Sequence, residues 1–334
     1  MIFLASILLS GCGLFSGGKT DIDPPQNVSY EEDIDDVDGK KDDSEAKVQR
    51  ELYLVDRDGY VVPRTIALPE SENAEKQVLE YLIEGGKVSS ILPKGFRAVL
   101  PKGTAVNVEV KDGIATVDFS KEFANYKAED EMKIIQSVTW TLTQFDTVKQ
   151  VKLKMNGEEL KEMPVNGYPL QSELTRKIGI NHDLKNVVDI SNTKAVVVYY
   201  VRQTDDEHYY VPVTKRVKTD GNHLLTAIVE QLIKGPDLQT PLFSALMPDV
   251  ALLNEPKLAN KIVTLNFNEN ILGSFDRNLI SDEVLQSIVL TLTEQEGIEG
   301  VSIQVNGKTD IENEKGEPIT EPVTRPETVN SVEL

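Results

Sequence analysis

The chain has 334 residues and carries a formal net charge of −20, from 55 acidic and 35 basic side chains. A charge of this sign repels a phosphate backbone, so we expect no nucleic-acid partner. The length exceeds that of one average domain, and the single cysteine excludes a disulfide within the chain.

The N-terminal segment predicts a secretory signal and a lipid anchor. Residues 1–11 are mainly apolar and end in Leu9-Ser10-Gly11, directly before Cys12. The run is too short to cross a bilayer, which takes about 20 apolar residues. Leu-Ser-Gly-Cys resembles a bacterial lipobox, which implies that residues 1–11 are a signal peptide and that Cys12 carries the lipid. No basic residue precedes the run, so we expect the true start to lie upstream.

Residues 12–48 predict a disordered tether. Between Asp21 and Glu45 the chain has eleven acidic residues against Lys40 and Lys41, and almost no apolar side chain. Such a segment cannot bury enough surface to offset the entropy lost on ordering. We therefore expect a solvated linker between the lipid anchor and the folded part.

The rest of the chain contains an internal repeat. Residues 136–143 reappear as residues 286–293, and residues 80–85 reappear as residues 230–235, both at an offset of 150 (286 − 136 and 230 − 80). This period is far longer than a solenoid unit of roughly 20 to 50 residues. We therefore expect two similar domains, the first at residues 49–170 and the second at residues 195–312.

The first domain is predicted to start with two strands and a helix. Strands are expected at Leu52–Val55 and Tyr60–Leu68, on either side of a turn that contains Gly59. A helix is expected from Ser71, which can act as its N-cap, to Glu84. Gly85 can take the left-handed conformation that ends it.

A hairpin, a second helix and a last strand follow. Asp112-Gly113 is typical of a two-residue type I′ loop, and counting outward from it pairs Val110 with Ala115, Val108 with Val117 and Val106 with Phe119. The next helix places Ile135, Val138 and Leu142 on its buried face. A closing strand is expected at Val148–Met155. The order ββαββαβ predicts the α+β class, with a mixed sheet and two helices packed on one face.

The second domain repeats this order with one difference. Asn260-Lys261 takes the loop position, so that Leu258 pairs with Val263 and Pro256 with Leu265. Because proline cannot donate to the ladder, this strand is expected at a sheet edge. The matching helix buries Leu285, Ile288 and Leu292, and the closing strand is Ile298–Val305. Residues 171–194 are predicted to be an ordered bridge, and residues 313–334 a flexible tail.

The search for chemistry finds no catalytic or metal-ligand pattern. The histidines lie apart from matching ligands, and Asp118, the best isolated carboxylate, is replaced by Asn266 in the second domain. We expect no enzyme activity, no metal and no cofactor. Gln136 and Gln286 are retained in both copies and are candidates for an exposed interaction surface, although the neighbouring Ser and Thr can also be explained by hydrogen bonds to helix carbonyls.

Several motifs together carry a family resemblance. Leu-Pro-Lys-Gly-Thr before a strand, the run from Val110 to Phe123, the Gln-Ser…Thr-Leu-Thr helix and the Val148 strand closed by Asn-Gly resemble the GerMN domain. Two such domains behind a lipobox are similar to sporulation and germination lipoproteins of endospore-forming bacteria. The resemblance implies folds similar to ring-building modules and no catalytic residues. It also implies a place in the mother-cell membrane, facing the space around the forespore, where the protein holds the intercellular channel complex.

We therefore interpret the chain as a membrane-anchored interaction protein whose partners are envelope proteins of that complex, and which could also form homo-oligomers. The alternative is a peptidoglycan-binding module, for which Tyr199, Tyr200, Tyr209 and Tyr210 are the only aromatic cluster. A wall-modifying enzyme is the third reading. It would need a cleft with paired acids, and the repeat supplies no matched pair.

Overall fold

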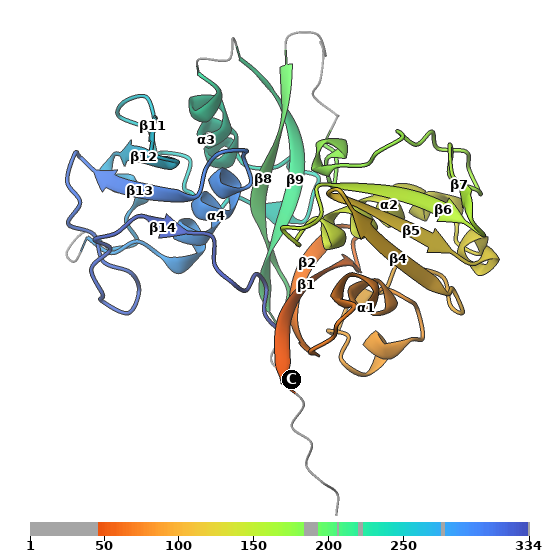
Figure 1. Ribbon diagram of the computed structural model, residues 1–334. Helices are drawn as coiled ribbons and strands as arrows, with labels where there is room; N and C mark the ends of the chain where they lie inside the picture. The colour runs from red at the N-terminus through yellow and green to blue at the C-terminus, as the bar shows by residue number, and fades with distance from the viewer. Residues whose placement is uncertain (1–45, 184–192, 206, 220–222, 275–277, 333–334) are drawn as a thin grey trace, which may run out of the picture. The chain divides into compact units, whose positions relative to one another are not determined.

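The protein is described by a computed structural model that covers residues 46–183, 193–205, 207–219, 223–274 and 278–332 (Figure 1). Cys12, the predicted signal peptide and nearly all of the predicted tether lie outside the described residues. Internal contacts divide the chain into Met1–Ser44 and Glu45–Leu334, and all the described residues belong to the second unit. No helix among the residues described is long and apolar enough to span a membrane.

The first repeat, residues 46–183, follows the predicted order of elements. Its strands form two sheets, with the orders β2-β1-β3 and β4-β5-β6-β7. Only β5 and β6 are parallel, because the crossover between them contains a helix. The bounds are β1 Lys47–Asp56, β2 Val61–Pro69, α1 Ala74–Glu80, β3 Phe96–Arg97, β4 Val106–Lys111, β5 Ile114–Phe119, α2 Glu131–Leu142, β6 Gln150–Met155 and β7 Glu158–Glu159.

The second repeat, residues 193–332, has the same arrangement. Its sheets have the orders β10-β8-β9 and β11-β12-β13-β14, and again one pair, β12 with β13, is parallel. The bounds are β8 Thr193–Gln203, β9 His208–Lys218, α3 Leu224–Lys234, β10 Leu242–Phe243, β11 Lys257–Ala259, β12 Ile262–Phe267, α4 Asp282–Thr293, β13 Gly300–Val305 and β14 Val323–Thr324. The α+β class, the two similar domains and the mixed sheets are thus confirmed, but the strands of each repeat are divided between two sheets.

The predicted hairpin register is confirmed in the first repeat and in part in the second. Val110 pairs with Ala115, Val108 with Val117 and Val106 with Phe119. In the second repeat Leu258 pairs with Val263, but the ladder ends at Lys257, so Pro256 has no partner in it. β11 lies at the edge of its sheet, as the missing N–H of Pro256 predicts.

The first helix is shorter than predicted. We expected Ser71 as N-cap and Glu84 as the last turn, but α1 begins after Asn73 and ends at Glu80, and the Ser71 hydroxyl accepts from the backbone of Asn73 instead. The reason lies far along the chain: the Leu82 carbonyl accepts the N–H groups of both Val99 and Leu100. Because the Leu82 carbonyl accepts these two bonds, it is not used in a further helical turn. The local sequence pattern does not show bonds to residues this far along the chain.

The core contains the predicted apolar faces of the second helices. α2 packs on β1 and α4 packs on β8, and the two helices within each repeat also touch each other. The predicted inward residues are all buried, and a continuous apolar cluster extends through both repeats. These residues are Ile135, Val138 and Leu142 on α2, and Leu285, Ile288 and Leu292 on α4. The two repeats therefore share one core rather than forming two separate ones.

The bridge and the tail differ from their predictions. In the bridge, Leu174 and Ile180 are buried as expected, while residues 184–192 lie outside the described part. The tail does not fray where it is described. β14 pairs with β13. The Val329 side chain is 2% exposed in a cluster with Tyr199 and Leu290 of the second repeat, and its backbone bonds Thr65 of the first repeat. The composition of the tail predicted a flexible segment. This prediction failed because the strands that hold the tail lie far away in the sequence.

Candidate functional site

The predicted interaction residues Gln136 and Gln286 do not form an exposed surface. Gln136 is 3% exposed, and its side-chain oxygen lies 3.4 Å from the backbone nitrogen of Asn181 in the bridge. Gln286 is half-buried. The expectation that Gln136 faces solvent is wrong because the bridge covers this face of α2. A Gln136→Lys substitution would therefore place a charge in the interior.

The retained threonines of the second helices hold the central strands. The Thr141 hydroxyl accepts the N–H of Tyr53 on β1, and the Thr291 hydroxyl accepts the N–H of Tyr199 on β8, each at 3.0 Å. Thr143 instead bonds back to a carbonyl of its own helix. The first threonine of Thr-Leu-Thr thus joins helix to strand in each repeat, and the second bonds within its own helix.

Two other groups singled out in the sequence also have structural roles. The side chains of Asp118 and Asn266 each accept an N–H from the Asn-Gly turn after the closing strand, at Gly157 (3.0 Å) and Gly307 (2.8 Å). Both residue types can supply this acceptor, which explains the substitution. Among the four clustered tyrosines, Tyr199, Tyr200 and Tyr209 are buried and Tyr210 is half-buried, so they offer no exposed platform for a sugar.

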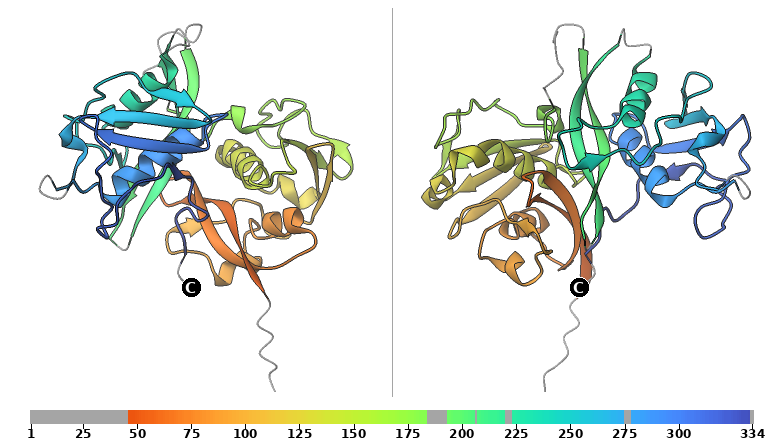
Figure 2. Two further views of the ribbon diagram at one scale, coloured as in Figure 1. Left: turned by 60° about the vertical axis from the view of Figure 1, so that its left-hand side comes forward. Right: turned by 180° about the vertical axis from the view of Figure 1, so that it is seen from behind.

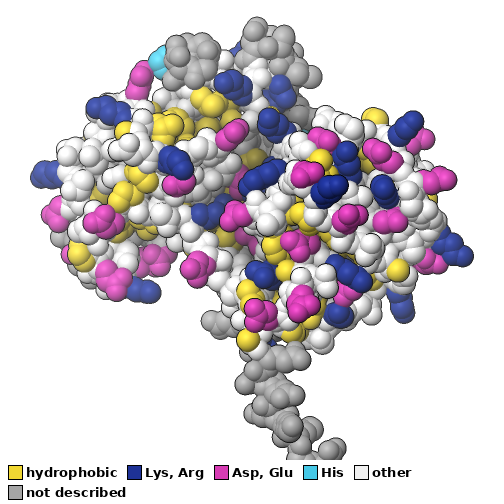
Figure 3. Space-filling view, viewed as in Figure 1, with side chains coloured by type: hydrophobic (Ala, Val, Ile, Leu, Met, Phe, Trp, Pro, Cys, Tyr) yellow, Lys and Arg dark blue, Asp and Glu magenta, His cyan; other side chains and the backbone are white. Residues whose placement is uncertain are grey.

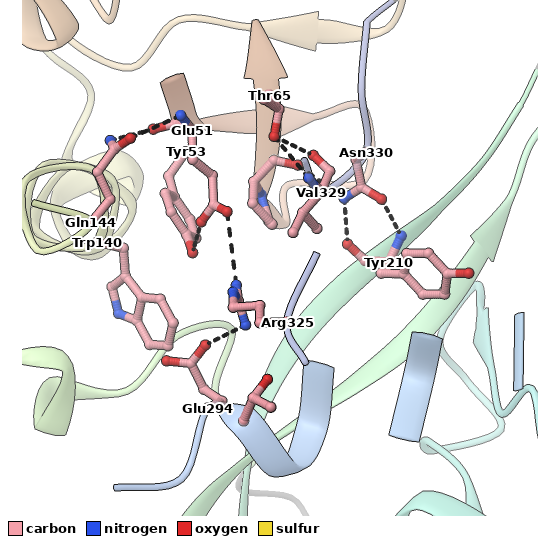
Figure 4. Close-up of polar contacts among 12 residues, drawn as sticks. Glu51, Tyr53, Thr65, Trp140, Gln144, Tyr210, Glu294, Arg325, Val329 and Asn330 are labelled. Carbon is pink, nitrogen blue, oxygen red and sulfur yellow. Dashed lines mark hydrogen bonds and ion pairs between the residues drawn. The ribbon is translucent and has the colours of Figure 1, made fainter. Parts of the chain in front are cut away.

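A polar cluster that draws on both repeats lies around Glu294, directly after α4 (Figure 4). Arg176 of the bridge donates to Glu294 Oε1 at 2.7 Å, and Arg325 of the tail donates to Oε2 at 3.2 Å. The Tyr199 hydroxyl also donates to Oε2, at 3.0 Å. One carboxylate of the second repeat is therefore shared by cations from the bridge and from the tail.

Aromatic rings of both repeats cover these cations. The Arg176 guanidinium lies 4.6 Å from the centre of the Trp140 ring, and the Arg325 guanidinium lies 5.6 Å from that of Tyr199. Burial and the Coulomb repulsion of Glu51 raise the pKa of Tyr53, so this hydroxyl stays neutral and donates to Glu51 at 2.6 Å. The cluster is thus charged, partly desolvated and internally satisfied, which favours one fixed geometry.

A second polar group joins the hairpins of the two repeats. Arg64 of β2 pairs with Glu207 at 2.9 Å, and the Tyr209 hydroxyl of β9 donates to Asp56 at 2.9 Å. Burial raises the pKa of Asp56, although hydrogen bonds from Tyr60 and Tyr209 oppose the shift. The position in the second repeat that matches Arg64 is Val213. Only the first repeat therefore supplies an arginine for this ion pair.

Two asparagines that were not predicted from the sequence complete the contact. Asn181 and Asn330 lie between the edge strands β2 and β9, which run side by side (Figure 2). Each side chain bonds a strand of its own repeat and a proline carbonyl of the other. A signal existed: Thr-Arg-x-x-x-Ile-Asn at residues 175–181 reappears as Thr-Arg-x-x-x-Val-Asn at residues 324–330.

Exposed apolar side chains are concentrated in the second repeat. Leu253 and Leu258, on either side of Pro256, are 49% and 52% exposed, and an open groove of about 440 Å³ separates this segment from α3. The first repeat exposes Val165 and Tyr168 to a similar extent. On the face shown in Figure 3, acidic and basic side chains are interspersed. Among the described residues, no three potential metal-ligating side chains are grouped.

Comparisons with known proteins agree with this architecture. The sequence profile of the family described as Germane: Sporulation and spore germination matches residues 51–161 and 197–310. The spore germination protein GerM of Bacillus subtilis (strain 168) is 50% identical over 348 aligned residues, which cover 98% of this chain and 95% of that protein. The solved tandem GerMN domains of the sporulation protein GerM from Bacillus subtilis match with a TM-score of 0.82 and 53% identity, covering 86% of this chain and 100% of that one.

Proposed function

Because the chain belongs to the Germane family of sporulation and spore germination proteins and has tandem GerMN domains, we propose that it is a non-enzymatic scaffold that positions envelope proteins around the forespore. Its partners would be members of the channel complex between mother cell and forespore. The observation that carries this proposal is the shared core and polar contact of the two repeats. A scaffold needs two modules at a constant separation, and the contact around Glu294 supplies that constraint.

We propose that a lipid on Cys12 anchors this scaffold in the mother-cell membrane, on the extracytoplasmic side. Two or three acyl chains, at about 0.8 kcal/mol per buried methylene, hold a protein far more firmly than one. The acidic segment from Asp21 to Glu45 would then set how far the folded unit stands from the bilayer.

The docking surface we propose is the apolar segment around Pro256. The edge strand β11 begins only after the proline, so a partner strand could pair with its outer edge and cover the exposed side chains of Leu253 and Leu258. Exposed leucines beside a groove are typical of a contact that a partner covers.

A pull-down from sporulating cells tests this proposal. The lipidated protein with Leu253→Glu and Leu258→Glu should recover its envelope partners at least tenfold less well than wild type. The matched control is Val165→Glu with Tyr168→Glu, which alters two side chains of similar exposure in the first repeat and should leave recovery unchanged. Equal recovery with both double variants would exclude the Pro256 segment. Saturable binding of purified peptidoglycan, or its hydrolysis, would replace the scaffold proposal by one of the two rival functions.

A further inference from the structure

The bridge and the tail make the same set of contacts on opposite repeats. In the bridge, Ile180 donates its N–H to the Thr214 hydroxyl at 2.7 Å and accepts the Thr214 N–H at 2.8 Å. In the tail, Val329 does the same with Thr65, at 2.8 Å and 3.0 Å. We name residues 175–183 and 324–332 the first and second hooks. Each hook follows one repeat and binds an edge strand of the other.

The asparagine of each hook joins the acceptor strand to a strand of its own repeat, through backbone groups of both. Asn330 donates to the Pro63 carbonyl at 2.9 Å and exchanges two hydrogen bonds of 2.8 Å with Tyr210 (Figure 4). Asn181 likewise bonds Pro212 and Val61. Both asparagines have positive φ angles, 46° and 52°, a conformation that Asn tolerates better than most residues. In both hooks a β-branched residue directly precedes the asparagine, and this pair of residues identifies a hook in the sequence.

The two hooks differ in how the chain connects them to their acceptors. The first hook lies 34 residues from Thr214, and the chain soon enters β8, the hairpin partner of its acceptor strand. The second hook lies 264 residues from Thr65 and reaches it only across the contact between the repeats. Closure of the second hook therefore depends on the contact between the repeats, and a second molecule offers the same acceptor strand.

We propose that the Pro63–Thr65 edge of β2 is a docking site for an extended peptide with a β-branched residue followed by Asn, and that it accepts this segment from a second copy of the chain as well as from its own. The contacts around Thr65 and Val329 are complete in themselves, since the buried N–H and hydroxyl groups find their partners within the hook and the strand. Exchange of the second hook between two molecules would therefore reproduce every bond of the single chain, as in domain swapping.

Mixing two full-length variants tests this proposal, in a Cys12→Ser background without lipid or thiol. One variant, Val329→Asp with Asn330→Ala, keeps the acceptor but lacks a competent hook. The other, Thr65→Val, keeps the hook but lacks the acceptor hydroxyl. Neither can close its own site fully, yet the mixture contains one intact hook and one intact acceptor. Light scattering after size-exclusion chromatography should show a 1:1 complex in the mixture and monomers in each separate sample.

The other hook provides the matched control. Replacing Thr65→Val by Thr214→Val leaves the β2 acceptor intact in both molecules, so the second variant keeps its own hook closed and the mixture should stay monomeric. A synthetic peptide of residues 322–332 should bind the hook-deficient variant saturably, and an Asn330→Ala version of the peptide should bind at least tenfold more weakly. Folding of each variant is checked by its cooperative unfolding.

Monomers in the mixture of folded variants, together with no saturable peptide binding, would overturn the proposal. If the hook-deficient variant does not fold, the wild type is used instead, with the peptide carrying a photo-crosslinker at the position of Ser331. Crosslinking to the fragment that contains Pro63–Thr65 supports the docking site, and crosslinking elsewhere or not at all contradicts it. This result is independent of the proposed function, because envelope partners are recruited at Leu253 and Leu258, away from Thr65.

Discussion

The Glu294 carboxylate joins the bridge, the tail and the second repeat, because it accepts hydrogen bonds from Arg176, Arg325 and Tyr199. Its side chain is 6% exposed and lies between Arg176 and Arg325, whose side chains are 29% and 26% exposed. Such partly buried pairs matter mainly when one member is removed. Without Glu294, Arg176 loses its carboxylate partner and Arg325 keeps only the longer pair with Glu51, at 3.8 Å. The residue therefore offers a direct test of whether the contact stabilises the fold.

Substituting Glu294→Gln should lower the free energy of unfolding by about 1–3 kcal/mol, since two charge-assisted hydrogen bonds to arginine are lost. Glu299→Gln is the control. It removes an exposed pair with Lys261 of similar length, 2.6 Å, which should cost less than about 1 kcal/mol. Urea denaturation of both variants measures the difference. Equal small effects would mean that the Glu294 cluster does not hold the repeats together.

Glu131, at the start of α2, gives the first repeat a dependence on pH. Burial alone would raise its pKa, but hydrogen bonds from the backbone of Asn166, Tyr168 and Val165 and from the Tyr126 hydroxyl lower it below the ordinary value. A depressed folded-state pKa contributes stability that is present above the unfolded pKa, about 4.3, and is lost as pH falls through the folded pKa.

We expect Glu131→Gln to destabilise the protein by about 1–3 kcal/mol at pH 7, because Gln offers a weaker acceptor to the same donors. The difference from wild type should begin to shrink below the unfolded pKa, about 4.3, and should be lost as pH falls through the lower pKa of the folded state. Chemical denaturation at pH 7, 5 and 3.5 tests this, with exposed Glu129→Gln as a control that should stay within about 0.5 kcal/mol. A difference that does not change with pH would assign the effect to side-chain packing.

At the scale of elements, local turn chemistry was the part that sequence predicted best. Asp112 and Gly113 have φ angles of 51° and 81°, as a type I′ turn requires, and Asn260 and Lys261 take 50° and 64° in the second repeat. The pairing of β4 with β5 follows directly from this turn. The end of α1 was predicted less well, because hydrogen bonds from Val99 and Leu100 compete with the helix and no short window contains them.

Gly113→Val should destabilise the first repeat by about 1–2 kcal/mol, since a β-branched residue resists a φ of 81°. Steric contact is not the cause, because an added Cβ would meet only Lys149, at 3.7 Å. Gly113→Asn is the matched control and should cost clearly less, because Asn adopts positive φ readily. Thermal unfolding compares the two. Equal losses for Val and Asn would show that the backbone conformation of this turn does not determine the effect.

At the scale of the whole molecule, the two domains could be predicted from the sequence, but the contact that joins them could not. The 150-residue offset and the ββαββαβ order were sufficient for the fold, because repeats and hydrophobic periodicity are local in the sequence. The contact between the repeats depends on Asn181 and Asn330, whose partners lie on strands of the opposite repeat. The Thr-Arg-x-x-x-(Ile/Val)-Asn repeat is visible in the sequence. It does not predict burial, because the polar residues of the bridge and the tail lack the hydrophobic periodicity that indicates a buried face.

Membrane attachment is predicted to depend on the single cysteine. In the bacterial host, Cys12→Ala should move the protein from the membrane fraction to the soluble extracytoplasmic fraction, because the lipid can no longer be attached. Sedimentation of lysates followed by immunoblotting measures the shift, and Ser10→Ala, which keeps the thiol, is the control. A Cys12→Ala protein that stays in the membrane fraction would show that another segment anchors it.

The central claim is that the two repeats form one rigid unit. Its most direct test is the distance between spin labels at Glu158 and Lys308, exposed residues at matching positions of the two repeats, in full-length protein with Cys12→Ser. Pulsed electron paramagnetic resonance should give one narrow distance distribution for this protein and a broad one after Asn181→Ala and Asn330→Ala are added. A broad or double distribution before the asparagines are changed would contradict the account.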